Sequence, residues 1–306
     1  MNFFRDIWTS GRPVCSVEFF PPKNEDSEKQ FLLTAERLKG YHPNFVSMTY
    51  GAGGSSRDRS IGFGQQLRTE FGYEVLPHLT CVGHSRAEIG SILDEFADRG
   101  FKGIMALRGD PPQGATEFKP HPDGLRYAAD LVSFIHQNHP SFALGVAGYP
   151  EKHPEADTAE NDLRHLTAKV GAGADFITTQ LFFDNADYFR FVKNCRAAGI
   201  TVPILPGILT AVSWKQVSRF SAMCGSKLPA QLAADLERAS GDPAAEEEVG
   251  INWAKDQIIG LLKAGAPGFH LYILNRSKPA LELMHRLGEE LGTDFRTIPR
   301  AEDKNL

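Results

Sequence analysis

The chain has 306 residues, of which 42% are hydrophobic and 23% are charged. These proportions are typical of a globular protein with a sizeable core, and the length suits one large barrel or two average domains. The formal net charge of -5 argues against a nucleic-acid-binding protein, which would usually be basic. No apolar run reaches transmembrane length and no secretory signal opens the chain, so we expect neither membrane insertion nor export.

The four cysteines are scattered along the chain and form no C-x-x-C pair. They are Cys15, Cys81, Cys195 and Cys224. This pattern indicates reduced, mostly buried thiols and a cytoplasmic location. No group of potential ligands has the clustered spacing of a metal site, so no metal is expected.

Strand and helix signals alternate from the first residues onward. A short amphipathic helix at the N-terminus precedes a strand at 13–20, which ends at Pro21 and Pro22 because neither can donate to a sheet ladder. Further strands are predicted at 44–49, 74–81, 101–107, 142–147, 174–180, 202–208 and 269–274. Helices are predicted at 24–39, 56–71, 85–99, 123–138, 158–171, 213–223, 229–239 and 244–264. Two more are predicted by their ends alone: one after the sixth strand that ends at Gly199, and a last one that ends at about Leu291.

Eight strand signals alternating with helices predict the fold class. The pattern is typical of α/β proteins built as a (β/α)8 TIM barrel, and a doubly wound sheet is the competing architecture. The count of eight favours the barrel. We expect a single catalytic domain over 1–296, including the N-terminal helix, and a loosely ordered tail at 297–306.

Polar side chains stand where most of the predicted strands end. In parallel barrels the active site lies at this end of the strands, so these residues are expected to lie together. They are Glu18, Thr49, His78, Arg108, Asp110, Tyr149, Gln180 and Arg276. The set holds few charges and several neutral donors and acceptors, which suits an organic cofactor with a polar heterocycle better than a metal.

Glu18 is the most informative of these residues. It lies near the end of a strand between Val17 and Phe19, and a carboxyl group among apolar side chains is poorly solvated. Such a group can stay protonated near neutral pH and act as a general acid. The alternative is a structural strand-end residue that reaches solvent.

Eight short motifs, none specific alone, together identify a known family. They occupy 17–23, 47–54, 78–81, 107–112, 148–155, 169–184, 206–208 and 269–276. In these segments the chain resembles methylenetetrahydrofolate reductase, a family of FAD-containing barrels, in its catalytic-domain-only form. The segments span nearly the whole chain in the family's order.

The resemblance implies a function. The protein would be an oxidoreductase acting on CH–NH donors, reducing 5,10-methylenetetrahydrofolate to 5-methyltetrahydrofolate in one-carbon metabolism and methionine biosynthesis. NAD(P)H would give a hydride to FAD and leave before the folate enters, in a ping-pong mechanism. The choice between NADH and NADPH stays open, and the family is usually a homo-oligomer.

The resemblance also implies roles for particular residues. Glu18 matches the general acid that protonates the folate, and Asp110 matches an acid near both flavin and folate. Residues at FAD-binding positions are Thr49, Tyr50, Ala52, His78, Arg108, Gly109, Asp110, Tyr127, Ala128, Tyr149, His153, Ala156, Asp162, His165 and Lys169. Residues at folate or nicotinamide positions are Glu18, Thr49, Asp110, Gln180, Gln216, Phe220, Tyr272 and Arg276. Phe220 would stack on the substrate, and Arg276 would pair with the glutamate carboxylate of the folate.

The chain departs from its relatives at two positions. Ala168 stands where some bacterial relatives carry Arg, and His165 replaces their Asn, so phosphate binding would depend more on Lys169. The S-adenosylmethionine-binding domain of larger members is not expected. Two alternatives stay open: a barrel that receives electrons from a partner protein, and a non-catalytic folate-binding subunit.

Overall fold

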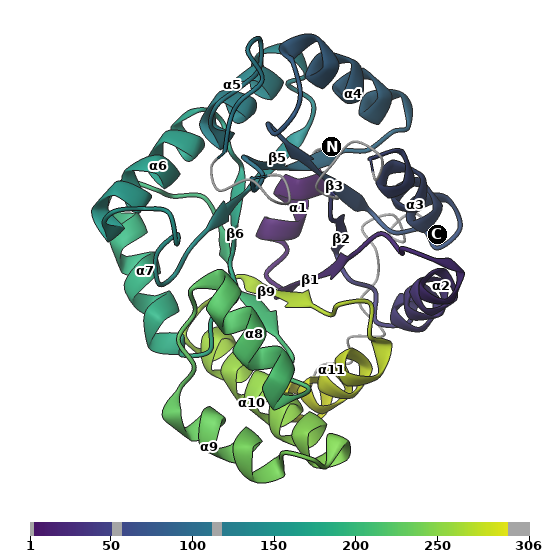
Figure 1. Cartoon of the computed structure of the whole chain (residues 1–306), viewed down its shortest axis with the longest axis vertical. Coiled ribbons are helices and arrows are strands. Elements are labelled where there is room, and N and C mark those ends of the chain that lie inside the picture. The colour runs from purple at the N-terminus through teal and green to yellow at the C-terminus, as the bar shows by residue number, and fades with distance from the viewer. Residues whose placement is uncertain (1–2, 51–56, 112–117, 293–306) are drawn as a thin grey trace.

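The computed structural model describes residues 3–50, 57–111 and 118–292, within which helices and strands alternate (Figure 1). The strands are β1 (Val14–Phe19), β2 (Phe45–Met48), β3 (Val75–Thr80), β4 (Gly103–Leu107), β5 (Ala143–Gly148), β6 (Phe176–Thr179), β7 (Ile204–Leu205), β8 (Gly207–Leu209) and β9 (Gly268–Tyr272). The helices are α1 (Phe3–Thr9), α2 (Glu25–Lys39), α3 (Arg57–Thr69), α4 (Arg86–Asp98), α5 (Ala128–Asn138), α6 (Ala159–Gly171), α7 (Asn185–Ala197), α8 (Trp214–Cys224), α9 (Ala230–Ala239), α10 (Pro243–Lys263) and α11 (Ser277–Leu291). Ala52 and the predicted tail at 297–306 lie outside the described residues.

All the strand pairs are parallel, and the strands form a nearly closed barrel. The order is β7-β6-β5-β4-β3-β2-β1-β9-β8. The predicted seventh strand, 202–208, is interrupted at Pro206, so β7 pairs with β6 while β8 pairs with β9. The amide of Gly207 donates to Thr179 Oγ1 at 2.9 Å, which joins β8 to β6 across the interruption. The (β/α)8 prediction is therefore confirmed, with one strand in two pieces because proline has no N–H for the ladder.

Most helix limits agree with the prediction, and α5 is the main exception. Helix α4 begins after Ser85 as expected, and Ser85 and Glu88 form a reciprocal capping box. The prediction that a helix begins at 123 is wrong, because α5 begins only at Ala128. The carboxylate of Asp130 accepts the amides of Arg126 and Tyr127, which fixes the start of α5 there.

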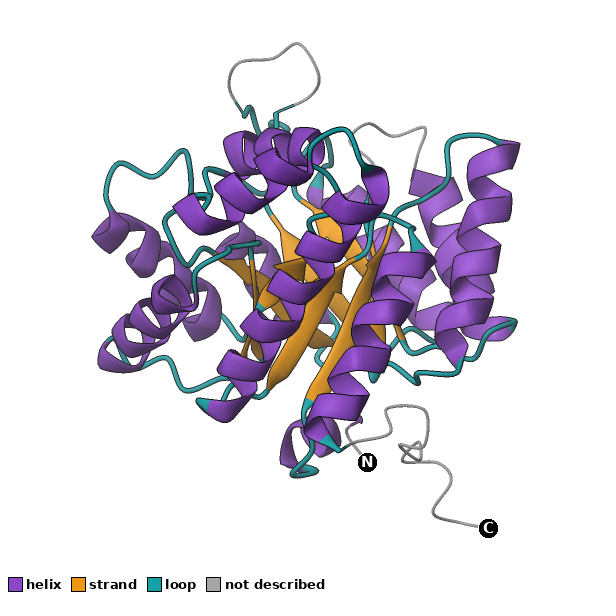
Figure 2. Cartoon of the chain, turned by 90° about the horizontal axis from the view of Figure 1, so that it is seen from below, coloured by secondary structure: helices purple, strands orange, loops and turns teal. Residues whose placement is uncertain are grey.

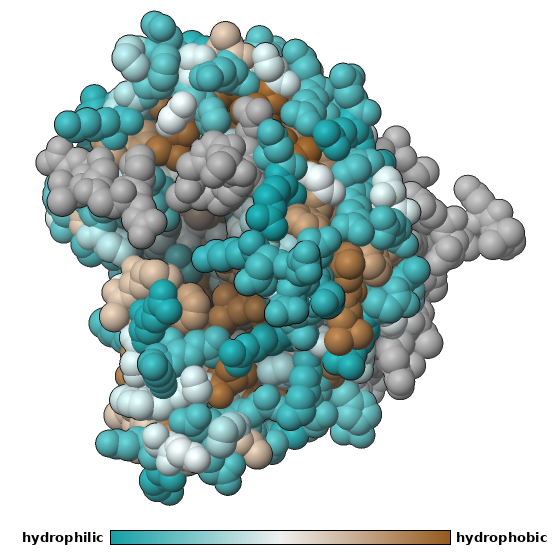
Figure 3. Space-filling view, turned by 45° about the vertical axis from the view of Figure 1, so that its right-hand side comes forward, coloured by the Kyte–Doolittle hydropathy of each residue, from teal (hydrophilic) through white to brown (hydrophobic). Residues whose placement is uncertain are grey.

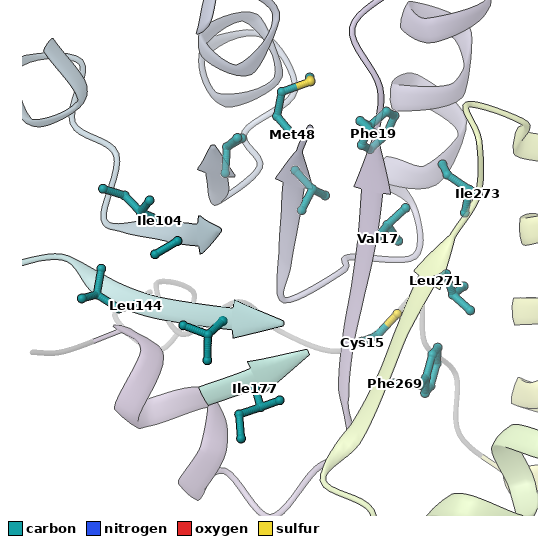
Figure 4. Close-up of a cluster of buried hydrophobic side chains, with 14 of the residues drawn as sticks. Cys15, Val17, Phe19, Met48, Ile104, Leu144, Ile177, Phe269, Leu271 and Ile273 are labelled. Atoms are coloured by element: carbon teal, nitrogen blue, oxygen red, sulfur yellow. The ribbon is translucent and has the colours of Figure 1, made fainter. Parts of the chain in front are cut away.

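The helices cover the outside of the barrel (Figure 2), and most of the face shown in Figure 3 is hydrophilic. Between helices and strands lies the main core, to which alternate strand residues contribute. Val17, Ile104, Ile177 and Leu271 are among the strand side chains that point into it (Figure 4). None of the helices in the described ranges is long and apolar enough to cross a membrane.

Helix α1 lies across the middle of the strand ring and closes its amino-terminal end (Figure 1). Its side chains join the lowest inward-facing strand residues in a second apolar cluster, which we call the floor cluster. The cluster comprises Phe4, Ile7, Val14, Phe45, Leu76, Met105, Ala143, Phe176 and Leu205. A side chain at Gly103 would come within 2.9 Å of the Phe4 ring, so the close approach of α1 to β4 depends on glycine there.

Three consecutive helices, α8 to α10, separate β8 from β9 and pack together at one side of the barrel (Figure 1). Val217 of α8 and Leu232 and Leu236 of α9 are buried in the apolar cluster between these helices and the ends of β6 and β8. This arrangement places α8 beside the carboxyl ends of the strands.

Candidate active site

A cavity of about 840 Å³ opens at the carboxyl ends of the strands and extends into the barrel. It reaches down to Phe45 and Met105, which belong to the floor cluster. Sixteen residues predicted from the sequence line it: Glu18, His78, Arg108, Gly109, Asp110, Tyr127, Ala128, Tyr149, His153, Ala156, Asp162, His165, Lys169, Gln180, Phe220 and Tyr272. Six of the eight strand-end residues expected to lie together therefore line one cavity, and Thr49 and Arg276 do not. The chemical roles of all these residues stay predictions.

Four predicted residues in the described part of the chain do not line this cavity. The carbonyl of Thr49 accepts the Ser60 hydroxyl at 2.6 Å, and the Tyr50 hydroxyl lies 2.8 Å from Nε2 of His84. Arg276 is exposed at the start of α11, and Gln216 lies on α8 with its Oε1 buried.

Glu18 lies inside the barrel, with only 8% of its surface exposed. The Ser47 hydroxyl donates to its Oε2 at 3.5 Å, and the same oxygen is 3.5 Å from Nε2 of His78. Nε2 of His270 lies 3.9 Å from it on the other side. The alternative of a strand-end carboxylate that simply reaches solvent does not describe this residue.

The two histidines beside Glu18 differ in their partners. Nδ1 of His270 hydrogen-bonds with the Ser16 hydroxyl at 2.7 Å. Nε2 of His78 is buried with no hydrogen-bond partner in the described chain. Burial lowers the pKa of His78, and although the nearby Glu18 carboxylate opposes this effect, the net shift is downward. Burial thus disfavours the charged form of His78, whose Nε2 lies beside the Glu18 carboxyl group.

Arg108 is one of two cationic side chains that the described residues contribute to the cavity wall. Its guanidinium donates in a bidentate manner to Glu155 at 2.6 and 2.7 Å, which raises the pKa of Arg108. The guanidinium also lies 5.1 Å from the centre of the Phe118 ring. Arg108 is therefore held in one orientation by a residue 47 positions away in the sequence.

Lys169 is the second cation, and its environment is less polar. Its ammonium donates to the carbonyl of Ala147. Although the whole side chain is only half-buried, burial of the amino group lowers the pKa of Lys169 to about 8, and the nearby Asp162 carboxylate opposes that shift. Asp162 in turn accepts the amide of His153 at 3.0 Å, which fixes the loop after β5.

Aromatic rings form two sides of the cavity. Tyr127 and His165 are stacked with ring centres 6.2 Å apart, and Tyr149 and His153 meet edge to face at 4.5 Å. On a third side, Tyr272 donates its hydroxyl to the carbonyl of Thr179 at 2.7 Å. Flat rings in the cavity lining suit a planar ligand.

Gly207 is required for this placement of Tyr272. A side chain at this position would lie 2.2 Å from the Thr179 carbonyl oxygen and 2.6 Å from the Tyr272 ring. The residue after Pro206 must therefore be glycine for the interrupted strand and the tyrosine to coexist.

Sequence reasoning missed several lining residues. Ser47, Thr178 and His270 each stand two positions before a residue that was named, so strand alternation could have identified them. Glu155 carries no local signal, because its partner is distant in the sequence. In the part of the chain that the structure describes, no three histidine, cysteine or acidic residues are grouped in a way that could hold a metal ion.

Fold and site together define a class: a parallel barrel with a large polar-walled cavity at the carboxyl ends of its strands, where barrel enzymes carry their active sites. Comparison with known proteins specifies the family. The family model described as methylenetetrahydrofolate reductase matches residues 3–288, and the chain belongs to that family.

Individual relatives carry the name of the same family. The Escherichia coli (strain K12) protein named 5,10-methylenetetrahydrofolate reductase is 39% identical over 282 residues, covering 92% of this chain and 93% of the relative. The Arabidopsis thaliana protein named methylenetetrahydrofolate reductase (NADH) 1 is 37% identical over 294 residues, covering 93% of this chain and 50% of the relative. The chain thus spans nearly all of the bacterial relative and about half of the plant relative.

Among solved structures, a Clostridium thermocellum protein has a similar fold. It is described as an uncharacterized protein that binds two copies of 5-methyl-5,6,7,8-tetrahydrofolic acid. The TM-score is 0.65 at 14% sequence identity, covering 94% of this chain and 98% of that chain. At this identity the likeness demonstrates the fold alone.

Proposed function

We propose that this protein reduces 5,10-methylenetetrahydrofolate to 5-methyltetrahydrofolate, with NAD(P)H as the hydride donor and FAD as the bound cofactor. The observation that carries the proposal is the buried Glu18 carboxyl group in the wall of a large cavity, in a chain of this family. A protein that only bound folate would have no need of a buried carboxylic acid beside its ligand.

The residues present fit FAD. The cavity holds two cations, Arg108 and Lys169, for a diphosphate, and flat rings for the isoalloxazine and adenine. Thr178 also lines the cavity, and its buried hydroxyl has no hydrogen-bond partner in the described chain, so it is available to a ligand. When bound, FAD would supply hydride transfer from the nicotinamide to the folate.

The chain's own residues would orient the substrates and move one proton. Glu18 would hold a proton on its carboxyl group and give it to the folate, so that the methylene bridge can open. His78, whose Nε2 lies 3.5 Å from Oε2 of Glu18, would help to orient that carboxyl group. Asp110, which follows β4 at the cavity wall, would face both ring systems.

Binding would use the cavity walls. Phe220 on α8 would stack on the flat part of either substrate, which explains how one pocket could serve NAD(P)H and folate in turn. Closely packed side chains around the reacting atoms would exclude water from hydride transfer.

Absorption spectroscopy of the purified protein tests this proposal. We expect a yellow protein that releases FAD on denaturation, loses its flavin absorbance with NADH or NADPH without oxygen, and regains it on addition of methylenetetrahydrofolate. A protein that FAD cannot reconstitute would refute the cofactor assignment. A flavin that neither nicotinamide reduces, but that methylenetetrahydrofolate reoxidises after chemical reduction with dithionite, would favour electron supply by a partner protein. Folate binding without reoxidation would favour the non-catalytic subunit.

A further inference from the structure

Helix α8 forms one wall of the candidate active site. Phe220, Met223 and Cys224 all line the cavity, and their spacing of three and four residues places them on one face of the helix. Met223 is 61% exposed, so this wall stands at the mouth of the cavity and is not part of the closed core. The position of α8 therefore sets the width of the pocket for a planar substrate.

Few polar contacts hold α8 in place. Three of its side-chain oxygens, on Gln216, Ser218 and Ser221, are buried without a hydrogen-bond partner in the described chain. Its first turn is capped by Ser213, whose hydroxyl accepts the Gln216 amide at 3.2 Å. The amide of Trp214 also donates to Oε1 of Glu246 on α10, at 3.5 Å. Otherwise α8 is held by apolar packing against α9 and the ends of β6 and β8, and by the contacts at its C-terminal end.

Two hydrogen bonds hold that end. After α8 the chain turns at Gly225 in a left-handed conformation, with φ of 71°. The Ser226 hydroxyl then donates to the carbonyl of Leu181 at 2.7 Å, and the amide of Lys227 donates to Oε1 of Glu151 at 2.8 Å. Glu151 belongs to the loop after β5, so its side chain connects α8 to the opposite part of the cavity rim.

Glu151 does not line the reaction cavity. It borders a second hollow of about 430 Å³ between α6 and α7, which shares Tyr149, Asp162 and Lys169 with the wall of the first. With a hollow behind it, the loop after β5 is not supported by close packing on that side. Glu151 is partly buried. This burial raises its pKa, and the hydrogen bond from the Lys227 amide only partly offsets the shift.

We propose that Glu151 is a positioning residue, whose hydrogen bond to the Lys227 amide fixes the substrate-facing side of α8. The inference rests on the proposed function, because it assigns Phe220 and its neighbours to the binding of folate and nicotinamide. Glu151 contacts neither substrate and takes part in no proton transfer. Its loss therefore weakens substrate binding and leaves the chemical step intact.

The test compares Glu151→Ala with Glu151→Gln. Alanine removes the acceptor, whereas glutamine keeps an oxygen in the same place for the Lys227 amide. A hydrogen bond to a charged group contributes enough for about a tenfold effect. We expect Glu151→Ala to raise KM for both substrates about tenfold with kcat within about twofold, and we expect Glu151→Gln to restore KM.

Two further variants separate this effect from general damage. Glu160→Ala removes an exposed carboxylate that borders the same hollow and does not contact α8, so its KM values should match the unmodified protein. Ser226→Ala removes the hydroxyl that bonds the Leu181 carbonyl and also interacts with Glu151, while the Lys227 amide keeps its acceptor, so it should raise KM by less than Glu151→Ala. FAD content should stay constant in all four variants.

Amide hydrogen exchange of residues 220–228 provides a readout that needs no substrate. Faster exchange of this segment in Glu151→Ala, and normal exchange in Glu151→Gln, is the expected result. Unchanged exchange in Glu151→Ala, or a glutamine variant that behaves like alanine, would overturn the inference. A protein inactive with folate would refute the proposed function instead, because the exchange experiment would still report on α8.

Discussion

The two halves of the barrel interior are built from alternate residues of the same strands, yet they have opposite chemistry. Phe45, Leu76 and Phe176 belong to the floor cluster at the amino-terminal end. Two positions further along the same strands stand Ser47, His78 and Thr178, which line the cavity. A step of two residues keeps the side chain on the same face and moves it one layer up the barrel.

This difference indicates that the two layers of the barrel interior have different roles. Phe176 is fully buried and meets the rings of Phe4, Phe45 and Trp8 at 5.5 to 6.0 Å, so the floor cluster contributes to stability. The upper layer instead buries a carboxyl group and an imidazole with few partners, which costs folding free energy. A protein retains such groups where a ligand completes their hydrogen bonding.

Glu18→Gln, in the upper layer, should have the largest effect on activity. It should show most clearly that this layer serves catalysis. Glutamine keeps the size of the side chain but removes the transferable proton. We expect folate reduction to fall by roughly 10²–10⁴, while flavin reduction by NAD(P)H stays within about tenfold, because hydride transfer to the flavin needs no acid. Stopped-flow measurement of each half-reaction decides this.

Glu36→Gln, on the exposed face of α2, is the matched control and should change neither half-reaction. Near-normal folate reduction in a folded Glu18→Gln protein would remove Glu18 from the mechanism.

Phe176→Ala, in the floor cluster, should lower stability and leave catalysis nearly unchanged. Removing a fully buried ring from the floor cluster should lower the free energy of unfolding by about 3–5 kcal/mol, with little change in kcat for the protein that remains folded. Denaturant unfolding with a parallel activity assay measures both. Phe189→Ala removes the same side chain from a site that is 40% exposed and should cost far less. Equal costs at the two positions would contradict the role given to the floor cluster.

Strand positions and the barrel could be predicted because they depend on local patterns. The interruption at Pro206 was missed although proline inside a strand is itself a warning. The late start of α5 depends on Asp130 folding back on the amides of residues 126 and 127, which competes with helix propensity.

The site could be predicted at the strand ends and less well elsewhere. His270 follows from alternation, since it precedes Tyr272 by two positions in the same strand. Glu151 and Glu155 could not be predicted, because their partners Lys227 and Arg108 lie 76 and 47 residues away. Contacts between loops carry no periodic signal, so they become visible only in the folded chain.

Lys169 should make cofactor binding depend on pH. Its pKa is lowered to about 8, so the free protein loses this positive charge as the pH rises through that value. A phosphate favours the charged amine, so FAD affinity should be highest below pH 8 and should fall above it. Losing one charge-assisted hydrogen bond corresponds to roughly 1.5–3 kcal/mol, or at least tenfold in Kd between pH 7 and 9.5.

Flavin fluorescence titration across this range measures the change. Lys169→Arg keeps its charge throughout and should flatten the profile, whereas Lys169→Met should bind weakly at every pH. A wild-type profile that is flat to pH 9.5 would show that Lys169 does not contact the phosphates.

The smallest expected effect concerns backbone strain above the cavity. Among described non-glycine residues with positive φ, Lys152, Leu274 and Asn275 lie in loops at the carboxyl ends of strands, and only His42 does not. Lys152 has φ of 146°, where a side chain costs about 1–3 kcal/mol. At most positions in helices and strands, a protein with glycine is less stable than the same protein with alanine by about 0.5–1 kcal/mol. At position 152 we expect the reverse, with the Lys152→Gly protein more stable than the Lys152→Ala protein by about 1 kcal/mol.

Both variants lose the hydrogen bond from the Lys152 ammonium to the Ala156 carbonyl, so the difference in their free energies of unfolding reports on the backbone alone. Glu36→Gly and Glu36→Ala in α2 should keep the ordinary order. If alanine is the more stable residue at 152 as well, the loop above the cavity stores no strain there.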